Sequence, residues 1–224
     1  MNENLETIIL AAGLGTRMKS RTIKILHRAA GRPIIDYVLD LALALSPRSP
    51  VMVIGHQREE VRNAVGERAR YAVQQEQLGT GHAVLQAASQ VEPAAGKRVL
   101  ILSGDVPLTR IETLQRLIEE HDRSGNALTL LTMKLADPAL YGRIVRDASG
   151  AVTRIVEAKD ANEDEKRIDE VNAGIYVFTG EHLFDNLRNL GNQNAQGEYY
   201  LTDLLHTIRD AGHRVGAVVA DDPV

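Results

Sequence analysis

Leu10–Met18 (LAAGLGTRM) has the residue types of an anion-binding turn. Gly13 and Gly15 allow the backbone to approach a ligand closely, and free backbone N–H groups ahead of a helix attract anions. Arg17 and Lys24 add fixed positive charge nearby. The turn matches neither the dinucleotide fingerprint, because a methionine replaces its third glycine, nor the P-loop, which needs Gly-Lys-Ser/Thr. A tight strand-to-helix turn with surface cations would use the same residues.

Asp105 is the candidate metal ligand of the chain. It follows an apolar run and the pair Ser103 and Gly104. A carboxylate at the end of a buried strand is suited to holding Mg²⁺ against phosphates, because this hard cation prefers oxygen ligands and retains some of its waters. The alternative is an aspartate that caps the next helix or stabilises the turn.

Gln74–Ala83 (QQEQLGTGHA) combines amides with flexible backbone. The amide of Gln74 offers one donor group and one acceptor, which suits the edge of a nucleobase. Gly79 and its neighbour Thr80 could close over a base or ribose, although Thr80 would equally serve as a helix N-cap. We interpret His82 as a structural histidine, since no carboxylate lies near it in the sequence.

The second half of the chain carries polar residues at strand ends. They are Gly142 within a Tyr-Gly-Arg-Ile motif, then Glu157 and Lys159, and then Asn172 at the start of an Asn-Ala-Gly-Ile motif. Sugar hydroxyls require both donors and acceptors, so these residues fit a sugar site. Each of them alone would also suit a turn or a charged surface.

Short apolar runs alternate with amphipathic stretches in the first 140 residues. We expect strands at Thr7–Leu10, Val51–Ile54, Arg98–Leu102 and Leu128–Met133. We expect helices at Pro33–Leu45, Gln57–Val65, Thr80–Ala88 and Ile111–His121, with Pro33 at the first helical position. This alternation predicts an α/β fold with a doubly wound, mostly parallel sheet, whose ligands lie beyond the carboxyl ends of the strands.

The later residues predict a half richer in β-structure. A hairpin is expected from Arg143–Arg146 and Val152–Val156, joined by an Asp-Ala-Ser-Gly turn. Lys159–Glu170 is expected to be a surface loop. Val171–Phe178 predicts a strand, Leu201–Asp210 a helix, and Arg214–Ala220 resembles a strand. Without a linker or repeat, residues 1–224 are expected to form one domain.

Composition excludes several classes of function. The 224 residues carry a net charge of -4 and no clustered basic face, which argues against nucleic-acid binding. The absence of cysteine excludes disulfides and thiol catalysis, and suits a cytoplasmic protein. No run is apolar enough for a membrane span, and no secretory signal is recognisable.

The motifs together resemble bacterial bifunctional N-acetylglucosamine-1-phosphate uridyltransferase/glucosamine-1-phosphate acetyltransferase, specifically its N-terminal uridyltransferase domain. The matching segments are LAAGLGTRMKS, KILHRAAGRP, QLGTGHA, SGDVPL, YGRIVR, IVEAKDA, EVNAGIYVF and NAQGEYYLTD. The resemblance implies a Rossmann-like, mixed sheet of the sugar nucleotidyltransferase type, with a hairpin-rich half for the sugar. It also implies transfer of a uridylyl group from UTP to N-acetylglucosamine 1-phosphate with Mg²⁺, which supplies a precursor of peptidoglycan and lipopolysaccharide.

The resemblance assigns roles to particular residues. Arg17, Lys24 and Asp105 would be catalytic, and Asp105 would be the metal ligand. The substrate-binding residues would be Leu10, Ala11, Ala12, Gly13, Gly15, Lys24, Gln74, Gly79, Thr80, Ser103, Gly104, Gly142, Glu157 and Asn172. In-line attack by the sugar phosphate on the α-phosphorus would need positioning and charge neutralisation, without a covalent enzyme intermediate.

The chain departs from the family pattern at three places. Thr22-Ile23-Lys24 replaces Leu-Pro-Lys, and Ser103-Gly104-Asp105 replaces the Tyr-Gly-Asp of some members. Val224 precedes the segment that carries the family's second metal ligand, an asparagine, and the β-helix acetyltransferase domain is expected to be absent. Two alternatives stay open: a glucose-1-phosphate thymidylyl- or uridylyltransferase, and a binding module with little turnover.

Overall fold

A mixed sheet organises the fold in the computed structural model, which describes residues 2–13, 15, 18, 20, 22–91 and 96–222. Within the described part of the chain, the nine-stranded sheet has a main path of β11-β7-β10-β6-β1-β4-β5. The bounds of these strands are β1 Leu5–Ala11, β4 Val51–Ile54, β5 Arg70–Val73, β6 Arg98–Ser103, β7 Leu128–Lys134, β10 Glu170–Thr179 and β11 Val215–Val219. Along this path, β10 runs antiparallel to β6 and β7, and the other pairs are parallel. The predicted mostly parallel sheet is therefore confirmed.

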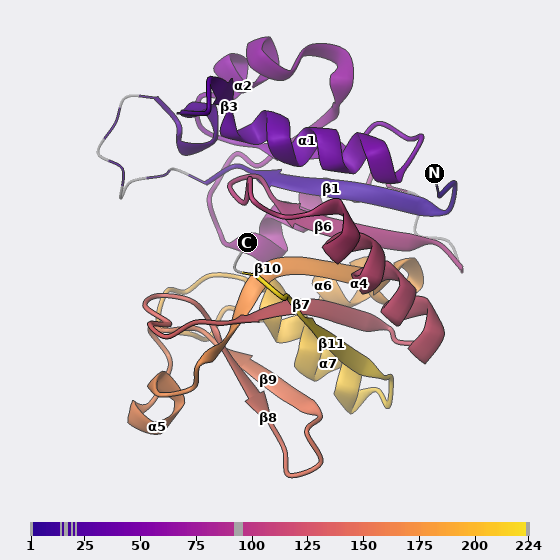
Figure 1. Cartoon of the computed structure of the whole chain (residues 1–224), viewed down its shortest axis with the longest axis vertical. Coiled ribbons are helices and arrows are strands. Elements are labelled where there is room, and N and C mark those ends of the chain that lie inside the picture. The colour runs from indigo at the N-terminus through magenta and orange to yellow at the C-terminus, as the bar shows by residue number, and fades with distance from the viewer. Residues whose placement is uncertain are drawn as a thin grey trace.

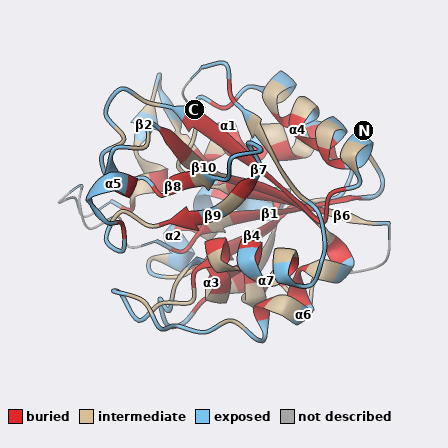
Figure 2. Ribbon diagram, turned by 90° about the horizontal axis from the view of Figure 1, so that it is seen from below, coloured by how far each residue is buried: buried red, intermediate tan, exposed pale blue. Residues whose placement is uncertain are grey.

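Helices cover both faces of the sheet (Figure 1). One face packs against α1 (Ile34–Leu45), α2 (Arg58–Val65) and α4 (Ile111–Ser124). The opposite face packs against α3 (Thr80–Gln86), α6 (Phe184–Leu187) and α7 (Leu204–Asp210). In Figure 2 the central strands are red along their length, with the helices around them. The sheet is thus doubly wound, as the alternation of apolar and amphipathic segments predicted.

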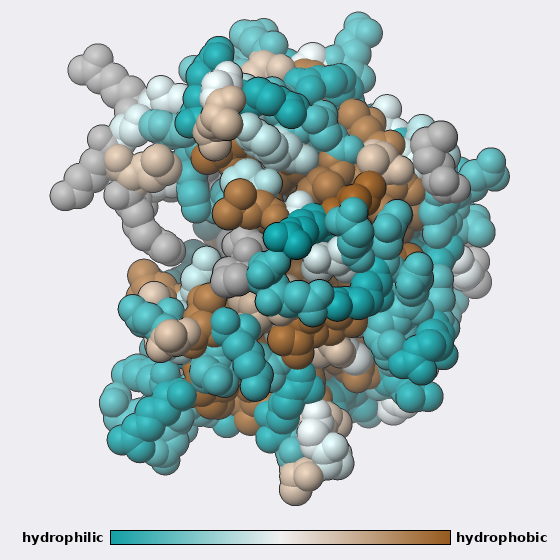
Figure 3. All heavy atoms as spheres, in the orientation of Figure 1, coloured by the Kyte–Doolittle hydropathy of each residue, from teal (hydrophilic) through white to brown (hydrophobic). Residues whose placement is uncertain are grey.

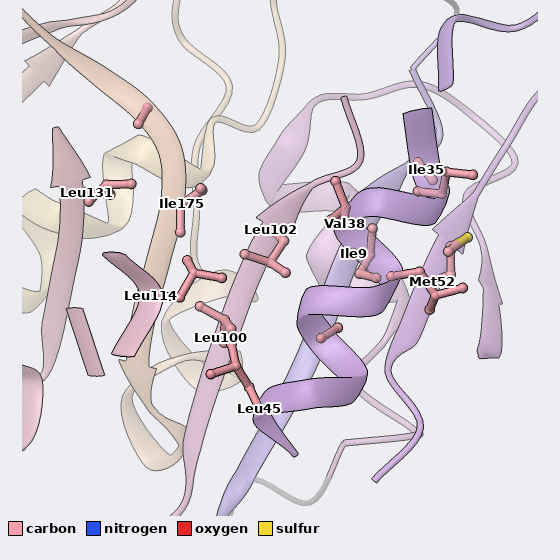
Figure 4. Close-up of a cluster of buried hydrophobic side chains, with 14 of the residues drawn as sticks. Ile9, Ile35, Val38, Leu45, Met52, Leu100, Leu102, Leu114, Leu131 and Ile175 are labelled. Atoms are coloured by element: carbon pink, nitrogen blue, oxygen red, sulfur yellow. The ribbon is translucent and has the colours of Figure 1, made fainter. Parts of the chain in front are cut away.

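The central strands bury side chains on both faces, which explains their continuous apolar sequences. Leu100 and Leu102 of β6 join the cluster beneath α1 and α4, whereas Val99 and Ile101 join the cluster on the other face. Successive side chains of a strand point to opposite faces, so a strand covered on both sides is apolar at most positions. Figure 4 shows Leu102 and Ile9 facing Val38 of α1 in the first cluster.

The predicted β-hairpin is confirmed. It consists of β8 (Arg143–Arg146) and β9 (Val152–Val156), and β8 joins the main sheet through β10. The predicted loop at Lys159–Glu170 is wrong in part, because α5 (Glu163–Lys166) forms inside it. A capping box explains this helix: the Asn162 side chain accepts from the Glu165 N–H, and the Glu165 carboxylate accepts from the Asn162 N–H.

Other boundaries differ from the expected ones in ways that local geometry explains. Pro33 is the N-cap of α1 and the last residue of β3 (Arg32–Pro33), which pairs with β2 (Arg28–Ala29), so Pro33 precedes the first helical position. The helix expected at Leu201–Asp210 begins as the 3₁₀ helix η5 (Leu201–Asp203) and continues as α7. The remaining 3₁₀ helices are η2 (Lys24–Leu26), η3 (Gly66–Arg68) and η4 (Gly180–His182).

Hydrophilic residues cover most of the face shown in Figure 3, with hydrophobic ones in patches between them. No helix in the described part of the chain is long and apolar enough to cross a membrane.

Candidate functional site

The first-half motifs converge on one cleft, although they lie far apart in the sequence. The cleft has a volume of about 510 Å³ and lies at the carboxyl ends of β1, β5 and β6. Its lining residues are Leu10, Ala11, Ala12, Gly13, Gly15, Met18, Lys24, Ile25, Gln74, Gln77, Gly79, Thr80, Ala83, Ser103, Asp105 and Glu198. This is the edge of the sheet at which the sequence predicted a ligand.

Lys24 and Asp105 form an ion pair in this cleft. The Lys24 Nζ atom lies 2.5 Å from Asp105 Oδ2, and the two side chains are 44% and 36% exposed. Lys24 begins η2, and Gly15 lies so close that a Cβ on Gly15 would come within 3.0 Å of the Lys24 Cβ. Because the pair is partly exposed, its attraction is weak enough to be exchanged for contacts with a ligand.

Asp105 is held just beyond the end of β6. The Gly104 N–H donates to the Leu10 carbonyl at 2.8 Å, and a Cβ on Gly104 would lie 2.9 Å from the same oxygen. The closest approach of β1 and this turn therefore needs glycine. The expected alternative, in which Asp105 caps the next helix, is wrong, since α4 begins at Ile111 with Arg110 as its N-cap.

The donor set around Asp105 fits Mg²⁺ bound mainly through a substrate. No group of three or more His, Asp or Glu side chains suited to a metal occurs among the described residues. Mg²⁺ commonly uses one or two carboxylates, with substrate phosphates and water completing its shell. The carboxylate of Asp105 in an open cleft meets that requirement, whereas a cation that needs a full protein cage would not fit.

Gln74 is the most deeply buried polar residue of the cleft. It follows β5, a short edge strand that was not expected, and only 3% of its surface is exposed. Its Nε2 donates to the Gly79 carbonyl at 3.0 Å and lies 3.0 Å from His82 Nδ1. Contacts with Gly79 and His82 therefore fix the orientation of the Gln74 amide.

The alternative in which Thr80 is the N-cap of the next helix is wrong. Gly79, with φ of +106°, is the N-cap of α3, and Thr80 is its first residue. The Thr80 hydroxyl instead accepts from the Leu201 N–H at 3.0 Å. A Cβ on Gly79 would lie 2.6 Å from the Tyr199 carbonyl. The start of α3 is therefore packed tightly against the segment that precedes η5.

The residues expected to bind sugar form a second connected group. The Asn172 N–H donates to the Gly142 carbonyl at 2.9 Å. A Cβ on Gly142 would lie 3.5 Å from both carboxylate oxygens of Glu157. The Thr202 hydroxyl donates to Glu157 Oε1 at 3.2 Å. Because Thr202 follows Leu201, this group adjoins the first-half cleft at Thr80.

A bulge in β10 provides another link between the two groups. The register of β10 against β7 shifts between Asn172 and Tyr176, and Gly174 in that interval has φ of +73°. The Ser103 hydroxyl donates to the Gly174 carbonyl at 3.2 Å. The bulge thus brings the strand that carries Asn172 against the residue two positions before Asp105.

Glu157 is a half-buried acidic residue in a partly anionic environment. Burial raises the pKa of Glu157, and the nearby carboxylates of Asp203, Asp160 and Glu198 raise it further, while the hydrogen bond from Thr202 lowers it. Among the described residues, no ion pair involves Glu157. Its protonated form would donate a hydrogen bond and its ionised form would accept, so either form suits a hydroxylated ligand.

Some residues expected in the site lie elsewhere or outside the described residues, and some residues that line it were not expected. Arg17, expected to be catalytic, lies outside the described residues. Lys159 is exposed. Sequence reasoning assigned no role to Glu198, Gln77, Met18, Ile25, Ala83 or Thr202, although Glu198 and Thr202 lie within the matched segment NAQGEYYLTD. Their roles depend on contacts between distant segments, which motif composition alone does not reveal.

Residues 6–223 match a family model described as "Nucleotidyl transferase". The chain is 49% identical over 215 residues to "Bifunctional protein GlmU" of Thermoanaerobacter pseudethanolicus, covering 96% of this chain and 47% of that protein. It is 48% identical to the protein of the same name from Corynebacterium aurimucosum, covering 98% of this chain and 46% of that protein. The chain therefore spans about half the length of the curated relatives it matches.

Two solved structures share the fold at low sequence identity. One is a putative glucose-1-phosphate thymidylyltransferase from Bacillus anthracis in complex with a sucrose, with a TM-score of 0.78, 19% identity, and coverage of 97% of this chain and 87% of that chain. The other is a UDP-glucose pyrophosphorylase complexed with UDP-glucose, with a TM-score of 0.75, 18% identity, and coverage of 96% and 90%. These likenesses support the fold class.

Proposed function

Because the chain belongs to the nucleotidyl transferase family, we propose that it transfers a uridylyl group from UTP to N-acetylglucosamine 1-phosphate in the presence of Mg²⁺. The products are UDP-N-acetylglucosamine and pyrophosphate. One observation carries this proposal: a cleft that combines Lys24 and Asp105 with Gln74, and that adjoins the group of Asn172, Gly142 and Glu157. The resemblance of the motifs to the uridyltransferase branch supports the choice of substrates.

In this proposal the residues of the first half bind the nucleotide. Gln74 and the backbone at Gly79 contact the base and ribose, and the backbone at Gly13 contacts the phosphates. Among the described residues, no atom lies within 4 Å of where a Cβ on Gly13 would be, so a ligand can approach the Gly13 backbone closely as far as these residues are concerned. Lys24 exchanges its contact with Asp105 for the phosphates and neutralises part of their charge.

The residues of the second half orient the sugar phosphate. Asn172, Gly142 and Glu157 contact the N-acetylglucosamine moiety, so that a phosphate oxygen of the sugar attacks the α-phosphorus of UTP. A new phosphorus–oxygen bond forms as the bond between the α-phosphorus and its bridging oxygen breaks, and pyrophosphate leaves with that electron pair. Asp105 holds Mg²⁺, which supplies stabilisation of the negative charge on the phosphates. The protein contributes mainly positioning and electrostatics.

A substrate panel tests the proposal. Pyrophosphate release is measured with UTP or dTTP, each combined with N-acetylglucosamine 1-phosphate or glucose 1-phosphate. We expect the highest kcat/KM for UTP with N-acetylglucosamine 1-phosphate. An equal or higher value for dTTP with glucose 1-phosphate would assign the chain to another branch, and binding of UTP without metal-dependent pyrophosphate release would identify a binding module.

A further inference from the structure

His82 contacts the buried amide of Gln74, and this contact has consequences for which nucleotide the cleft accepts. Gln74 Nε2 lies 3.0 Å from the Gly79 carbonyl oxygen. An amide oxygen in that place would face another oxygen, so the carbonyl of Gly79 assigns the NH₂ group of Gln74 to this side. The second hydrogen of the same NH₂ group points to His82 Nδ1, also at 3.0 Å.

The carbonyl oxygen of Gln74 is consequently the free end of the amide. Gln74 lines the cleft and is 3% exposed, and no hydrogen bond among the described residues reaches its Oε1. Oε1 is not among the buried unpartnered side-chain atoms of the described residues, so it is open to the cleft, where it can accept a hydrogen bond from a ligand. Gln74 Oε1 is therefore an acceptor that is available to a hydrogen-bond donor of a ligand in the cleft.

His82 can sustain this arrangement in only one tautomer. Its Nδ1 must accept from Gln74, so the neutral ring carries its proton on Nε2. Gln86 Nε2 lies 3.1 Å from His82 Nε2 and 3.1 Å from the His82 carbonyl. A neutral imidazole cannot accept at both nitrogens. Gln86 is half-buried and can turn its amide toward water, but Gln74 is enclosed and held by Gly79, so Nδ1 keeps the acceptor role.

We propose that His82 is a positioning residue that sets base selectivity by fixing the amide of Gln74 with Oε1 toward the cleft. An acceptor there favours pyrimidines whose ring N3 carries a hydrogen, as in uracil. It disfavours cytosine, whose N3 is itself an acceptor. This inference rests on the proposed function, because it concerns the nucleotide that the same cleft binds.

Two substitutions of His82 distinguish the loss of its hydrogen-bond acceptor from the loss of its aromatic ring. His82→Phe keeps an aromatic ring beside Tyr199, whose ring centroid lies 6.5 Å from that of His82, but offers no acceptor. His82→Asn removes the ring but places an amide oxygen near the position of Nδ1. His206→Phe, at an exposed histidine of α7, is the matched control. Dissociation constants for UTP and CTP are measured by calorimetry with Mg²⁺, and melting temperatures are recorded for every variant.

We expect the wild type to prefer UTP over CTP. His82→Phe should reduce that preference about tenfold, the effect of one reoriented hydrogen-bonding group. His82→Asn and His206→Phe should retain the preference. A role in packing alone would weaken UTP and CTP binding together and would lower the melting temperature without changing their ratio.

The outcomes distinguish this inference from the proposed function. A wild type that binds UTP and CTP equally would contradict both. A wild type that prefers UTP, with an unchanged ratio in His82→Phe or an equal loss in His82→Asn, would overturn the role of His82 alone. If His82→Phe does not fold, His82→Leu provides the same comparison without an acceptor.

Discussion

The pairing of Lys24 with Asp105 is the clearest chemical feature at the scale of single residues. The two positions are 81 residues apart and meet at 2.5 Å between Nζ and Oδ2. An ion pair with this exposure contributes about 0–1 kcal/mol to stability, so folding depends little on it. The pair is therefore available for exchange with the charges of a ligand, which is what a reaction between two phosphates would require.

Replacing Asp105 tests this separation between function and folding. Asp105→Asn should reduce kcat by at least tenfold at saturating Mg²⁺, because metal stabilisation of phosphate charge is worth several kcal/mol and tenfold corresponds to about 1.4 kcal/mol. The melting temperature should stay within a few degrees of the wild-type value. Pyrophosphate release and thermal unfolding provide the two measurements.

The control for this substitution is Asp40→Asn. Asp40 also forms an ion pair, with Arg32 at 2.6 Å, but it is 52% exposed and lies outside the cleft. Asp40→Asn should leave kcat unchanged. A loss of rate below tenfold in Asp105→Asn, or an equal loss in both variants, would identify Asp105 as a turn residue.

At the scale of elements, the packing of α3 decides the shape of the cleft beside Gly79 and Thr80. The Gly81 N–H donates to the Tyr199 carbonyl and the Tyr199 N–H donates to the Leu78 carbonyl, each at 2.8 Å. These bonds tie the start of α3 to the segment before η5. Gly79 is essential to the close approach, because its φ is +106° and it has no side chain to meet Tyr199.

Gly79→Ala should therefore destabilise the protein more than an ordinary glycine substitution. Gly150→Ala is the matched control, since Gly150 also has positive φ but a Cβ there would meet no atom of the described residues within 4 Å. We expect a loss of roughly 1 kcal/mol for Gly150→Ala, from backbone strain, and roughly 3 kcal/mol for Gly79→Ala, from strain and overlap together. Denaturant unfolding measures both, and equal losses would contradict the packing of α3 described above.

At the scale of the whole molecule, the two ends of the sheet differ in structure. The carboxyl ends of β1, β5 and β6 form the cleft. Near the opposite end, His121 of α4 is buried, with its ring nitrogens 3.0 Å from Thr129 Oγ1 and 3.1 Å from Thr179 Oγ1. Burial lowers the pKa of His121 from 6.5 to about 4; the nearby Asp122 raises it and Arg98 lowers it.

The lowered pKa of His121 predicts how the free energy of unfolding depends on pH. Because the folded-state pKa is below the unfolded one, the unfolded chain takes up the proton first, and stability is lost as the pH falls from about 6.5 to about 4. The difference between these values corresponds to about 3 kcal/mol as an order of magnitude. His121→Gln should remove this part of the pH dependence.

The free energy of unfolding of the wild type and of His121→Gln is measured by denaturant titration between pH 7 and pH 4. The exposed His206→Gln serves as the control for loss of a histidine. The gap between wild type and His121→Gln should change with pH over this window, whereas the gap for His206→Gln should stay nearly constant. A pH-independent gap for His121→Gln would show that His121 titrates alike in the folded and unfolded states.

Much of the fold follows from the sequence because its signals are local. Val51–Ile54, Arg143–Arg146 and Val152–Val156 form strands with the bounds that the sequence indicated. Val51–Ile54 is buried at every position, and a strand buried on both faces is mainly apolar, so its sequence is distinctive. The two hairpin strands are marked by the turn signal between them. The edge strand β5 was missed because it is short and only partly apolar, and α5 was missed because its acidic residues resemble those of a loop.

The location of the cleft at the strand ends also followed from the order of the elements, since a doubly wound sheet brings the carboxyl ends of its parallel strands together. What only the tertiary structure decided are the partners of each group: Lys24 with Asp105, Gln74 with His82, and Glu157 with Thr202. These contacts depend on the bulge in β10 and on the packing of α3 against the segment before η5. The bulge and the packing of α3 fix the positions of these side chains to within a fraction of an ångström. Such positions result from the balance of many contacts between distant segments, which no local pattern of residues encodes.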